Sequence, residues 1–381
     1  MDAPVKTNWL LVFMLLLAGL FAAAQFGKLT LTLEVMQVSY RSAANLVSIL
    51  VTIVGMVGII FGAVAGSTVV RIGITRALTA SLFLGGTLSI LQAMMPSFEV
   101  FAGLRIIEGF SHLAIVVAAP TLIAACTSDK DRPIAMGIWA SFFGLSLALS
   151  AVFIPGLLSW GRLPAVFLAH GVGMLVVAGL LYPLLPKRRI SKTVSISYLG
   201  EHKIIYSHAA LMAPGMVFVW YTLIYIALLA ILPGILDLPL WSISVIPLVS
   251  LAGTFLAGFL ARHIPPLHIA GVGFVGTAGF MIGVATQANP LIAVFALMLV
   301  MGLIPGACFA AIPYFNEPAT NRARATGCIA QMGNVGTTLG TPIFVLVAQQ
   351  GGLLAVAAIT IGFCVIGLGI IAMLLRRMAH V

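Results

Sequence analysis

Three ionisable residues lie close together in an otherwise apolar part of the chain. The segment "RIIEGFSHL", residues 105–113, holds Arg105, Glu108 and His112, although only 7% of all residues are charged. If the segment is a helix, about 100° of rotation per residue places the three side chains on one face. A carboxylate beside a guanidinium and an imidazole can hold an ion pair or exchange a proton.

The surrounding sequence predicts the environment of this face. The chain has 381 residues, 61% of them hydrophobic, and a mean hydropathy of +1.18. Apolar runs of about 20 residues recur from end to end, which is typical of membrane-spanning helices. We therefore expect an all-α membrane protein. A charged side chain near the bilayer centre costs roughly 2.5–3.5 kcal/mol, so the face should meet a partner or a cavity.

The apolar windows predict twelve membrane-spanning helices arranged as two bundles of six. The predicted organisation is an N-terminal bundle over 1–185, a cytoplasmic linker over 186–208 and a C-terminal bundle over 209–381. The linker is the longest polar stretch. The windows are about 9–31, 44–67, 77–96, 99–123, 134–156, 163–185, 209–233, 242–262, 267–288, 290–314, 326–348 and 352–375.

The basic residues predict the orientation. Most of the 19 Lys and Arg residues fall at the termini, in the linker or in alternate loops. The positive-inside rule therefore places both termini and the linker on the cytoplasmic side of the membrane. The membrane we expect is a bacterial inner membrane. The net charge of +10 then reflects topology, and no nucleic-acid partner is expected. A cleaved signal peptide ending near 22–25 would leave an odd number of spans, which disfavours it.

The two halves repeat the same pattern of residues. Pro120 follows Gly109 by eleven positions, and Pro313 follows Gly302 by eleven. The basic loops "DRPIAMG" and "NRARATG" come next in the two halves. Matching offsets indicate an internal repeat of six helices, which is typical of transporters that expose a midplane site alternately to each side.

The loop after the second predicted span resembles a motif of the major facilitator superfamily. In "GSTVVRIGITR", residues 66–76, the matching residues are Gly66, Arg71, Gly73 and Arg76, whereas Val70 stands at the usual aspartate position. In similar transporters this loop closes the cytoplasmic side. The resemblance thus implies a gating role for the four matching residues, with a weaker or rewired latch.

The fourth predicted span and the whole chain are similar to the same family. "RIIEGF" resembles its fourth-helix motif, with Arg105 and Gly109 in register. The resemblance implies the two-bundle fold and a secondary transporter that works by alternating access. The fifth-helix motif of proton antiporters is poorly kept in "GIWASFFGLSLALSAVFIPG", which favours proton-coupled uptake over export.

Two interpretations of the opening segment stay open. Arg105 and Glu108 can form a structural ion pair, or Arg105 can lie at the outer interface. Alternatively, desolvation and the neighbouring Arg pull the Glu108 carboxyl in opposite directions, and it exchanges a proton with help from Arg105 and His112. His170, in the sixth window, is expected to be an isolated packing residue.

Polar residues elsewhere in the spans are candidates for contact with substrate. Lys28 is either an interfacial anchor or a cavity residue. If Lys28, Arg105 and Glu108 all line the cavity, two positive charges face one negative charge. This excess of one positive charge favours a small organic anion or zwitterion taken up with protons. The substrate-binding candidates are Gln25, Lys28, Arg105, Tyr221, Tyr225, Gln331 and Asn334.

Other classes of function lack their motifs. The chain has no GxxxxGK[ST] for an ATP-driven pump and no HExxH or His/Cys metal cluster, so neither an enzyme nor a metal or other cofactor is expected. The alternatives are a proton antiporter that exports amphipathic compounds or a siderophore and, with less support, a non-transporting receptor. The expected partners are a small-molecule substrate, protons and the lipid bilayer, and the expected state is a monomer.

The orientation is testable with reporter fusions. A reporter fused after Val381 should behave as cytoplasmic, and one inserted beside Asp237 as periplasmic, because basic loops stay inside. Activity of a periplasm-dependent phosphatase and fluorescence of a cytoplasm-dependent protein give opposite readouts for the two sites. A periplasmic C-terminus would contradict both the span count and the repeat.

Overall fold

The computed structural model describes residues 6–186, 197–286 and 289–379, and over these ranges the chain forms helices and no strand. The elements are α1 (Trp9–Thr30), α2 (Leu33–Ser39), η1 (Arg41–Leu46), α3 (Ile49–Ile72), α4 (Ile74–Ala93), α5 (Phe98–Ala125), α6 (Arg132–Ala140), α7 (Phe142–Leu181), η2 (Tyr182–Leu184), α8 (Tyr198–Ser207), α9 (Ala209–Ile235), α10 (Leu240–Leu260), α11 (Pro266–Thr286), α12 (Pro290–Phe315) and α13 (Ala319–Ala379).

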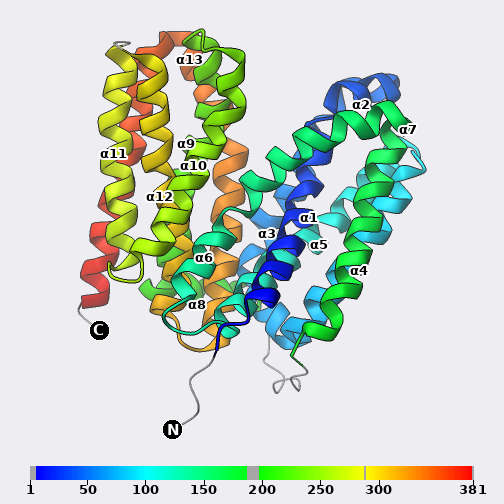
Figure 1. The fold of residues 1–381 in the computed structure, drawn as a ribbon, viewed down its shortest axis with the longest axis horizontal. Helices are drawn as coiled ribbons and strands as arrows, with labels where there is room; N and C mark the ends of the chain where they lie inside the picture. Colours follow the sequence, from blue (N-terminus) through cyan, green and yellow to red (C-terminus); the bar gives the residue numbers. More distant parts are fainter. Residues whose placement is uncertain (1–5, 187–196, 287–288, 380–381) are drawn as a thin grey trace.

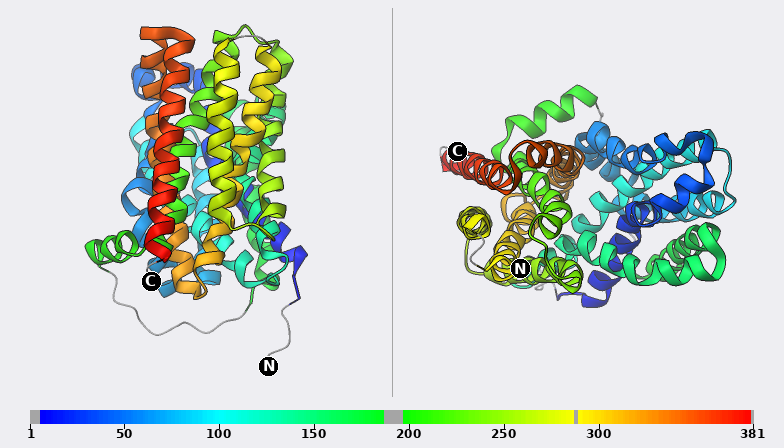
Figure 2. Two further views of the ribbon diagram at one scale, coloured as in Figure 1. Left: turned by 90° about the vertical axis from the view of Figure 1, so that its left-hand side faces the viewer. Right: turned by 90° about the horizontal axis from the view of Figure 1, so that it is seen from above.

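The helices gather in two groups. α1 to α5 and α7 lie on one side of the molecule and α9 to α13 on the other, with α6 and α8 at the end where both chain termini lie (Figure 1). We call this the termini end. The two groups come together there and spread apart toward the opposite end. Figure 2 shows the same division from above and α8 lying beside the main body.

Two helices are too long to be single membrane spans. Among the described residues, ten segments are long and apolar enough to cross a membrane, and two of them, Phe142–Leu184 and Ala319–Ala379, have 43 and 61 residues. At about 1.5 Å per residue, each would be more than twice the roughly 30 Å of a bilayer core. Non-helical backbone at Gly161 and Arg162 divides the first, and at Gly352 the second. Because each of these two segments consists of two spans, the ten segments correspond to twelve membrane spans. This confirms the predicted number of spans.

The two breaks have the same backbone geometry. Arg162 has φ +56° and ψ −155°, and Gly352 has φ +57° and ψ −149°. Arg162 precedes Gly352 by 190 positions, the separation that also relates Arg132 to Arg322. The repeat predicted from the sequence therefore extends to individual dihedral angles. Glycine adopts such angles without strain, whereas a residue with a side chain does not.

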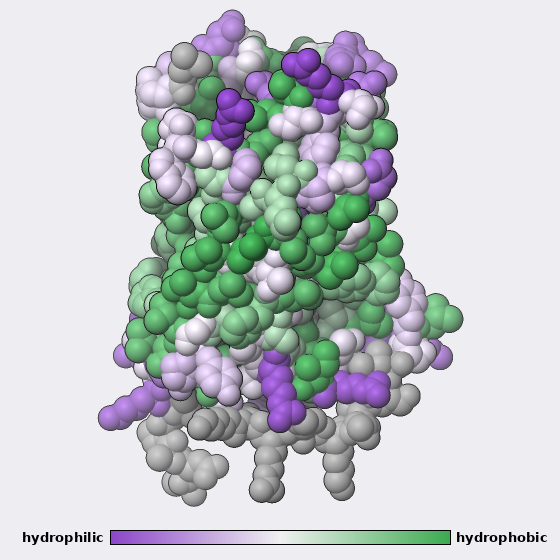
Figure 3. All heavy atoms as spheres, turned by 90° about the vertical axis from the view of Figure 1, so that its right-hand side faces the viewer, coloured by the Kyte–Doolittle hydropathy of each residue, from purple (hydrophilic) through white to green (hydrophobic). Residues whose placement is uncertain are grey.

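The outer surface matches a lipid environment. Leu168, Val172, Val176 and Leu180 are 44%, 46%, 53% and 54% exposed. Their spacing of four places them on one face of α7, where water would disfavour such a stripe. Figure 3 shows an apolar band across the middle of this side of the molecule, with polar residues above and below it.

Two boundaries differ from the sequence prediction. The second span begins at Ile49 and not near 44, because η1 forms a short 3-10 turn over Arg41–Leu46 before α3 starts. The predicted linker is not all loop. Its residues 187–196 lie outside the described residues, and Tyr198–Ser207 forms α8, whose first turn is capped by the Ser197 hydroxyl, which accepts from the Gly200 amide.

The helix breaks predict opposite effects of two substitutions. Gly352→Ala should lower stability by about 1–3 kcal/mol through backbone strain alone, because an added Cβ meets nothing within 4 Å. Arg162→Gly should instead raise stability or leave it unchanged. Thermal unfolding in detergent measures both. Gly362→Ala, also with open space but without a positive φ, is the matched control and should not be destabilising.

Candidate functional site

The opening segment forms part of α5 and is buried. Arg105 and Glu108 have no exposed surface, and His112 is 5% exposed. Arg105 Nη1 lies 2.5 Å from a Glu108 carboxylate oxygen. Arg105 also donates from Nε to the Leu50 carbonyl at 2.9 Å and from Nη1 to the Gln25 carbonyl at 3.0 Å. One guanidinium therefore connects α5 to both α1 and α3, and it does not lie at an interface with water.

Lys28 supplies a second cation to the same carboxylate. Its Nζ lies 2.6 Å from Glu108 Oε1 and also donates to Ser89 Oγ and Gln92 Oε1, both at 2.9 Å. Gln92 Nε2 in turn donates to Glu108 Oε2 at 2.6 Å. Lys28 is 2% exposed, so its interpretation as an interfacial anchor is wrong.

His170 belongs to the same group of side chains. The expectation from the sequence that it is an isolated packing residue is therefore wrong. Its Nδ1 lies 3.0 Å from Ser89 Oγ and 3.5 Å from Lys28 Nζ, and its Nε2 lies 2.9 Å from the Phe21 carbonyl. No sequence pattern identifies Ser89, Gln92 or His170 as partners of Lys28, because they come from other spans. We call Lys28, Ser89, Gln92, Arg105, Glu108 and His170 the charge cluster.

A cavity of about 550 Å³ lies between the two groups of helices. His112 of α5 lines it, together with Tyr221 and Tyr225 of α9 and Asn334 of α13. Thr30 and Phe26, near the end of α1 remote from the N-terminus, also line it. The cavity therefore occupies the middle of the molecule and the half opposite the termini end.

The structure brings some substrate-binding candidates to this cavity and not others. Tyr221, Tyr225 and Asn334 are among its lining residues. Gln25, Lys28, Arg105 and Gln331 are not among them. The first three are buried within the N-terminal group of helices, and Gln331 is 7% exposed at the contact between the groups. For these, contact with substrate stays a prediction.

The lining is aromatic and hydroxylic. Tyr221 and Tyr225 stack with ring centroids 5.1 Å apart, and Phe26 meets the His112 ring edge-on at 4.9 Å. No Lys, Arg, Asp or Glu is among the lining residues of this cavity. His112 Nδ1 lies 2.9 Å from the Ala22 carbonyl, which can only accept, so Nδ1 donates and the neutral ring keeps its lone pair on Nε2.

Glycines allow the two groups to touch at the termini end. A Cβ added to Gly62 of α3 would lie 2.6 Å from Cβ of Gln331 on α13, and one added to Gly66 would collide with the Ala323 carbonyl. Gln331 Nε2 donates across this contact to the Ile59 carbonyl at 2.7 Å. Small residues let helix backbones approach closely in a membrane. Gln331 therefore links α13 to α3 at this end.

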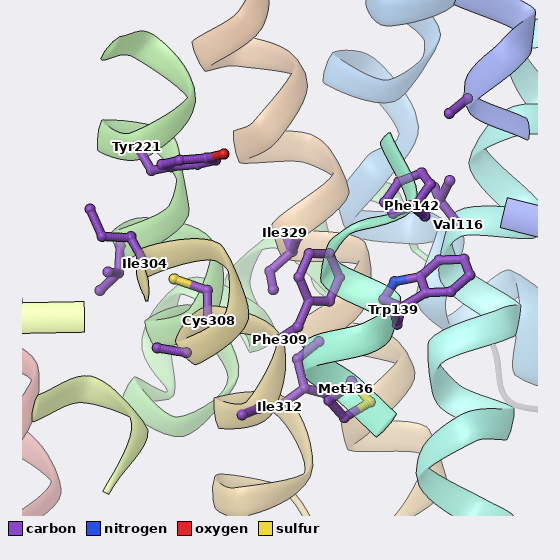
Figure 4. Close-up of a cluster of buried hydrophobic side chains, with 14 of the residues drawn as sticks. Val116, Met136, Trp139, Phe142, Tyr221, Ile304, Cys308, Phe309, Ile312 and Ile329 are labelled. Atoms are coloured by element: carbon purple, nitrogen blue, oxygen red, sulfur yellow. The ribbon is translucent and has the colours of Figure 1, made fainter. Parts of the chain in front are cut away.

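A second contact lies beneath the cavity, between α6 and the helices α10 and α12. A Cβ added to Gly137 would lie 2.9 Å from Cα of Gly258. Met136 of α6 lies beside Ile312 of α12 in an apolar cluster that also holds Phe309, while the Trp139 ring is directed away from α12 toward Gly19 of α1 (Figure 4). This cluster forms the floor of the cavity and separates it from the termini end.

The linker helix α8 adds polar bonds across the closed end. Glu201 is 2% exposed and accepts from Arg324 of α13 at 2.8 and 2.9 Å and from the Ser67 hydroxyl of α3. The Tyr198 hydroxyl donates to the Ile60 carbonyl of α3 at 2.8 Å, and that of Tyr206 to Gln331 at 2.6 Å. One short helix thus bonds to both groups.

The loop motif after α3 takes part in this closure in an altered form. Gly66 permits the contact with α13, and Gly73, with φ +96°, joins α3 to α4. Arg71 and Arg76 are exposed. Val70 provides no carboxylate, and Glu201 of α8 supplies one between α3 and Arg324. Gating by Gly66, Arg71, Gly73 and Arg76 remains a prediction.

The charge state of Glu201 makes this bond dependent on pH. Burial acts to raise the pKa of Glu201, but hydrogen bonds from Arg324 and Ser67 outweigh it and lower that pKa below its usual value. A lowered folded-state pKa means that the stabilisation is present at neutral pH. It is lost in acid, as the pH falls through the folded pKa.

Within residues 6–186, 197–286 and 289–379, no group of three or more His, Cys, Asp or Glu side chains is placed to hold a metal ion.

Removing the Glu201 charge should open the termini end. Glu201→Gln leaves Arg324 without its carboxylate, which we expect to shift the equilibrium by roughly 1–3 kcal/mol toward states with this end open. Labelling of Thr338→Cys in the cavity by a membrane-impermeant thiol reagent, in a Cys126→Ser background, should fall. Glu99→Gln, at an exposed site, is the control. Unchanged labelling in Glu201→Gln would show that α8 does not hold the end closed.

Comparisons with known proteins agree on the fold. Two solved structures resemble this one over nearly their whole lengths. The crystal structure of the human organic anion transporter MFSD10 has a TM-score of 0.77 and 14% identity, covering 95% of this chain and 98% of that one. The proton:xylose symporter XylE, bound to 6-bromo-6-deoxy-D-glucose, has a TM-score of 0.75 and 15% identity, covering 97% and 95%. At these identities the likeness shows the fold alone.

Sequence comparison gives the family. A search against curated proteins returns no significant match. The sequence model of the Major Facilitator Superfamily matches residues 15–317, which is most of the chain. Members of this family are membrane transporters and not enzymes. The twelve spans, the cavity between two groups of helices and this match lead to one conclusion: the chain belongs to the major facilitator superfamily.

Proposed function

We propose that the protein is a proton-coupled secondary transporter that carries a small amphipathic molecule, neutral or weakly charged, by alternating access. The observation that carries this proposal is the chemistry of the cavity between the two groups of helices. It is lined by aromatic rings, aliphatic side chains, hydroxyls, one amide and an imidazole, with no fully charged side chain among its described lining residues.

The closed termini end supports alternating access. The cavity extends toward the opposite end, while glycine contacts, the apolar floor and α8 close the termini end. With the orientation that the basic loops predict, this is an outward-facing state in a bacterial inner membrane. Substrate would reach the opposite side after these contacts break and the groups close over the cavity.

The cavity favours a neutral substrate over the organic anion or zwitterion expected from the sequence. Lys28 and Arg105 direct their charges to Glu108 within the bundle and not into the cavity. An anion in the cavity would lose water without gaining a cation, which is costly, whereas hydroxyls and aromatic rings suit a polar aromatic compound.

Uptake of an organic anion is the second candidate. The charge cluster holds two cations and one carboxylate, and Glu108 lies one helical turn from His112 in the cavity wall. This excess positive charge favours an anion near His112 at longer range. MFSD10 is titled an organic anion transporter and XylE a xylose symporter, so the two relatives do not favour one class.

Proton coupling is proposed to reside in the N-terminal group of helices. Arg105, Glu108 and His112 lie on one face of α5, and His112 alone of the three reaches the cavity. Two atoms of this region, Arg105 Nη2 and Gln25 Oε1, have no hydrogen-bond partner among the described residues. Buried polar atoms in proteins are usually hydrogen-bonded, so these two atoms leave places in the cluster for a further polar partner such as water.

Matched ligands test the substrate class. Purified protein is screened by thermal shift against pairs that share one aromatic skeleton, one member a carboxylate and the other its amide. The amide should stabilise the protein and the carboxylate should not, because no cation lines the cavity. A hit is then tested for accumulation in proteoliposomes with an imposed proton gradient, which tests transport and coupling.

Variants locate the binding of such a hit. Tyr221→Ala and Asn334→Ala should each weaken it by roughly tenfold or more, as residues at the centre of a pocket do. Tyr182→Ala, at a site 70% exposed outside the cavity, is the control. Stabilisation by carboxylates alone would favour the second candidate. Failure of any hit to cross the proteoliposome membrane would contradict transport.

A further inference from the structure

The hydrogen bonds of Glu108 restrict which group can exchange a proton. The carboxylate receives Lys28 Nζ, Arg105 Nη1 and Gln92 Nε2, all of which are donors. A protonated carboxyl would need an acceptor for its hydrogen, and none of these three provides one. Rotating the Gln92 amide to offer its oxygen would turn its NH₂ group toward the Lys28 ammonium. The contacts therefore hold Glu108 as a carboxylate.

The charges of the cluster are unbalanced. Lys28 and Arg105 carry two positive charges against one carboxylate, and all three side chains are at most 2% exposed. α4 contributes only the uncharged Ser89 and Gln92, and α7 contributes His170. His170 Nε2 donates to the Phe21 carbonyl, and the Lys28 ammonium 3.5 Å from Nδ1 disfavours a second proton on the ring, so the ring is neutral with its lone pair on Nδ1. A buried excess charge inside a membrane protein is costly.

Only one group can remove this excess. Protonating Glu108 would raise the net charge to two, and a guanidinium does not lose its proton in proteins. An ammonium can. We infer that Lys28, and not Glu108, is the residue whose proton is released and regained in the transport cycle. This inference rests on the proposed function and assigns its coupling group.

The cluster keeps its structure when Lys28 is neutral. Glu108 retains the bonds from Arg105 and Gln92, now as a balanced pair, and the Lys28 amine stays beside Ser89. When the N–H bond breaks, the electron pair stays on Nζ. The proton passes to water, with His170 Nδ1, 3.5 Å away, as the free base nearest to it among its contacts.

The cavity can sense this change. Phe26, two residues before Lys28 on α1, lines the cavity, and so does His112, one turn after Glu108 on α5. Substrate that displaces Phe26 or His112 moves the helices that carry the two charges. Lys28 and Glu108 lie 2.6 Å apart, so a small movement changes how strongly the carboxylate stabilises the ammonium.

The test follows the conformational equilibrium and needs no substrate. Spin labels on Ser39→Cys and Asp237→Cys, both exposed and in opposite groups at the open end, report the distance between the groups. The background is the full chain with Cys126→Ser. Over roughly pH 6 to 10, the ratio of the two states in otherwise unchanged protein should vary at least about fivefold, the low end of usual coupling between sites.

Two substitutions of Lys28 separate titration from structure. Lys28→Arg keeps the charge at every pH, and Lys28→Met keeps the neutral form and a similar length. Each substitution should reduce the pH-dependent variation of the ratio between the two conformational states to less than about twofold. The two variants should favour different conformational states. Lys28→Met should remain folded, because it leaves Arg105 and Glu108 balanced. Size-exclusion profile and thermal unfolding check this.

The opposite results overturn the inference. If Lys28→Met and Lys28→Arg keep the pH dependence while Glu108→Gln abolishes it, Glu108 carries the proton. If the unsubstituted protein shows no pH dependence, the inference fails whatever the variants do. The proteoliposome assay decides separately whether the protein transports. The assignment of Lys28 as the coupling group can therefore be wrong while the proposed transport function is correct.

Discussion

The Glu108 carboxylate is the centre of the N-terminal group of helices. It lies in an apolar bundle where a single charge would be strongly disfavoured, and Lys28 and Arg105 offset that cost at 2.6 and 2.5 Å. Arg105 also bonds to carbonyls of α1 and α3. Because the charges must remain paired, the helices that carry them cannot separate freely. The packing of α1, α3, α4, α5 and α7 is organised around this requirement.

The contact between the two groups of helices follows different physics. It is made by glycine backbones, an apolar floor and a few polar bonds at one end, with no large ionic core. Gly62 and Gly66 let α3 touch α13, and α8 bonds to both. Apart from the Glu201–Arg324 pair and the partly exposed Asp131–Arg262 pair, such contacts can break without separating opposite charges. A rigid bundle that keeps its own charges paired and a thin, releasable contact suit movement of one half against the other.

The cavity connects these two parts. Its lining includes residues of α1 and α5, which also carry the charge cluster, and residues of α13, which carries the closed end. A ligand there touches Phe26, His112 and Asn334, each within one or two turns of a group that holds a charge or a contact. Binding can therefore change both the cluster and the closure without a separate relay.

The sequence by itself determined the fold class, the number of spans and the internal repeat. These follow from hydrophobic length and from residue spacing, which are local properties of the chain. Arg105, Glu108 and His112 could be placed on one face because helical periodicity fixes their directions. Tyr221, Tyr225 and Asn334 could be proposed for the cavity because polar groups are rare in apolar spans.

Only the tertiary structure decided which polar residues meet. Ser89, Gln92 and His170 are ordinary residues of other spans, and no spacing connects them to Lys28. Packing placed Lys28 inside the bundle and Gln331 at the contact between halves, although both resembled cavity residues in the sequence. The role of Glu201 depends on where α8 docks. Pairing between helices distant in the chain depends on rotation and depth of packing, which a linear pattern does not encode.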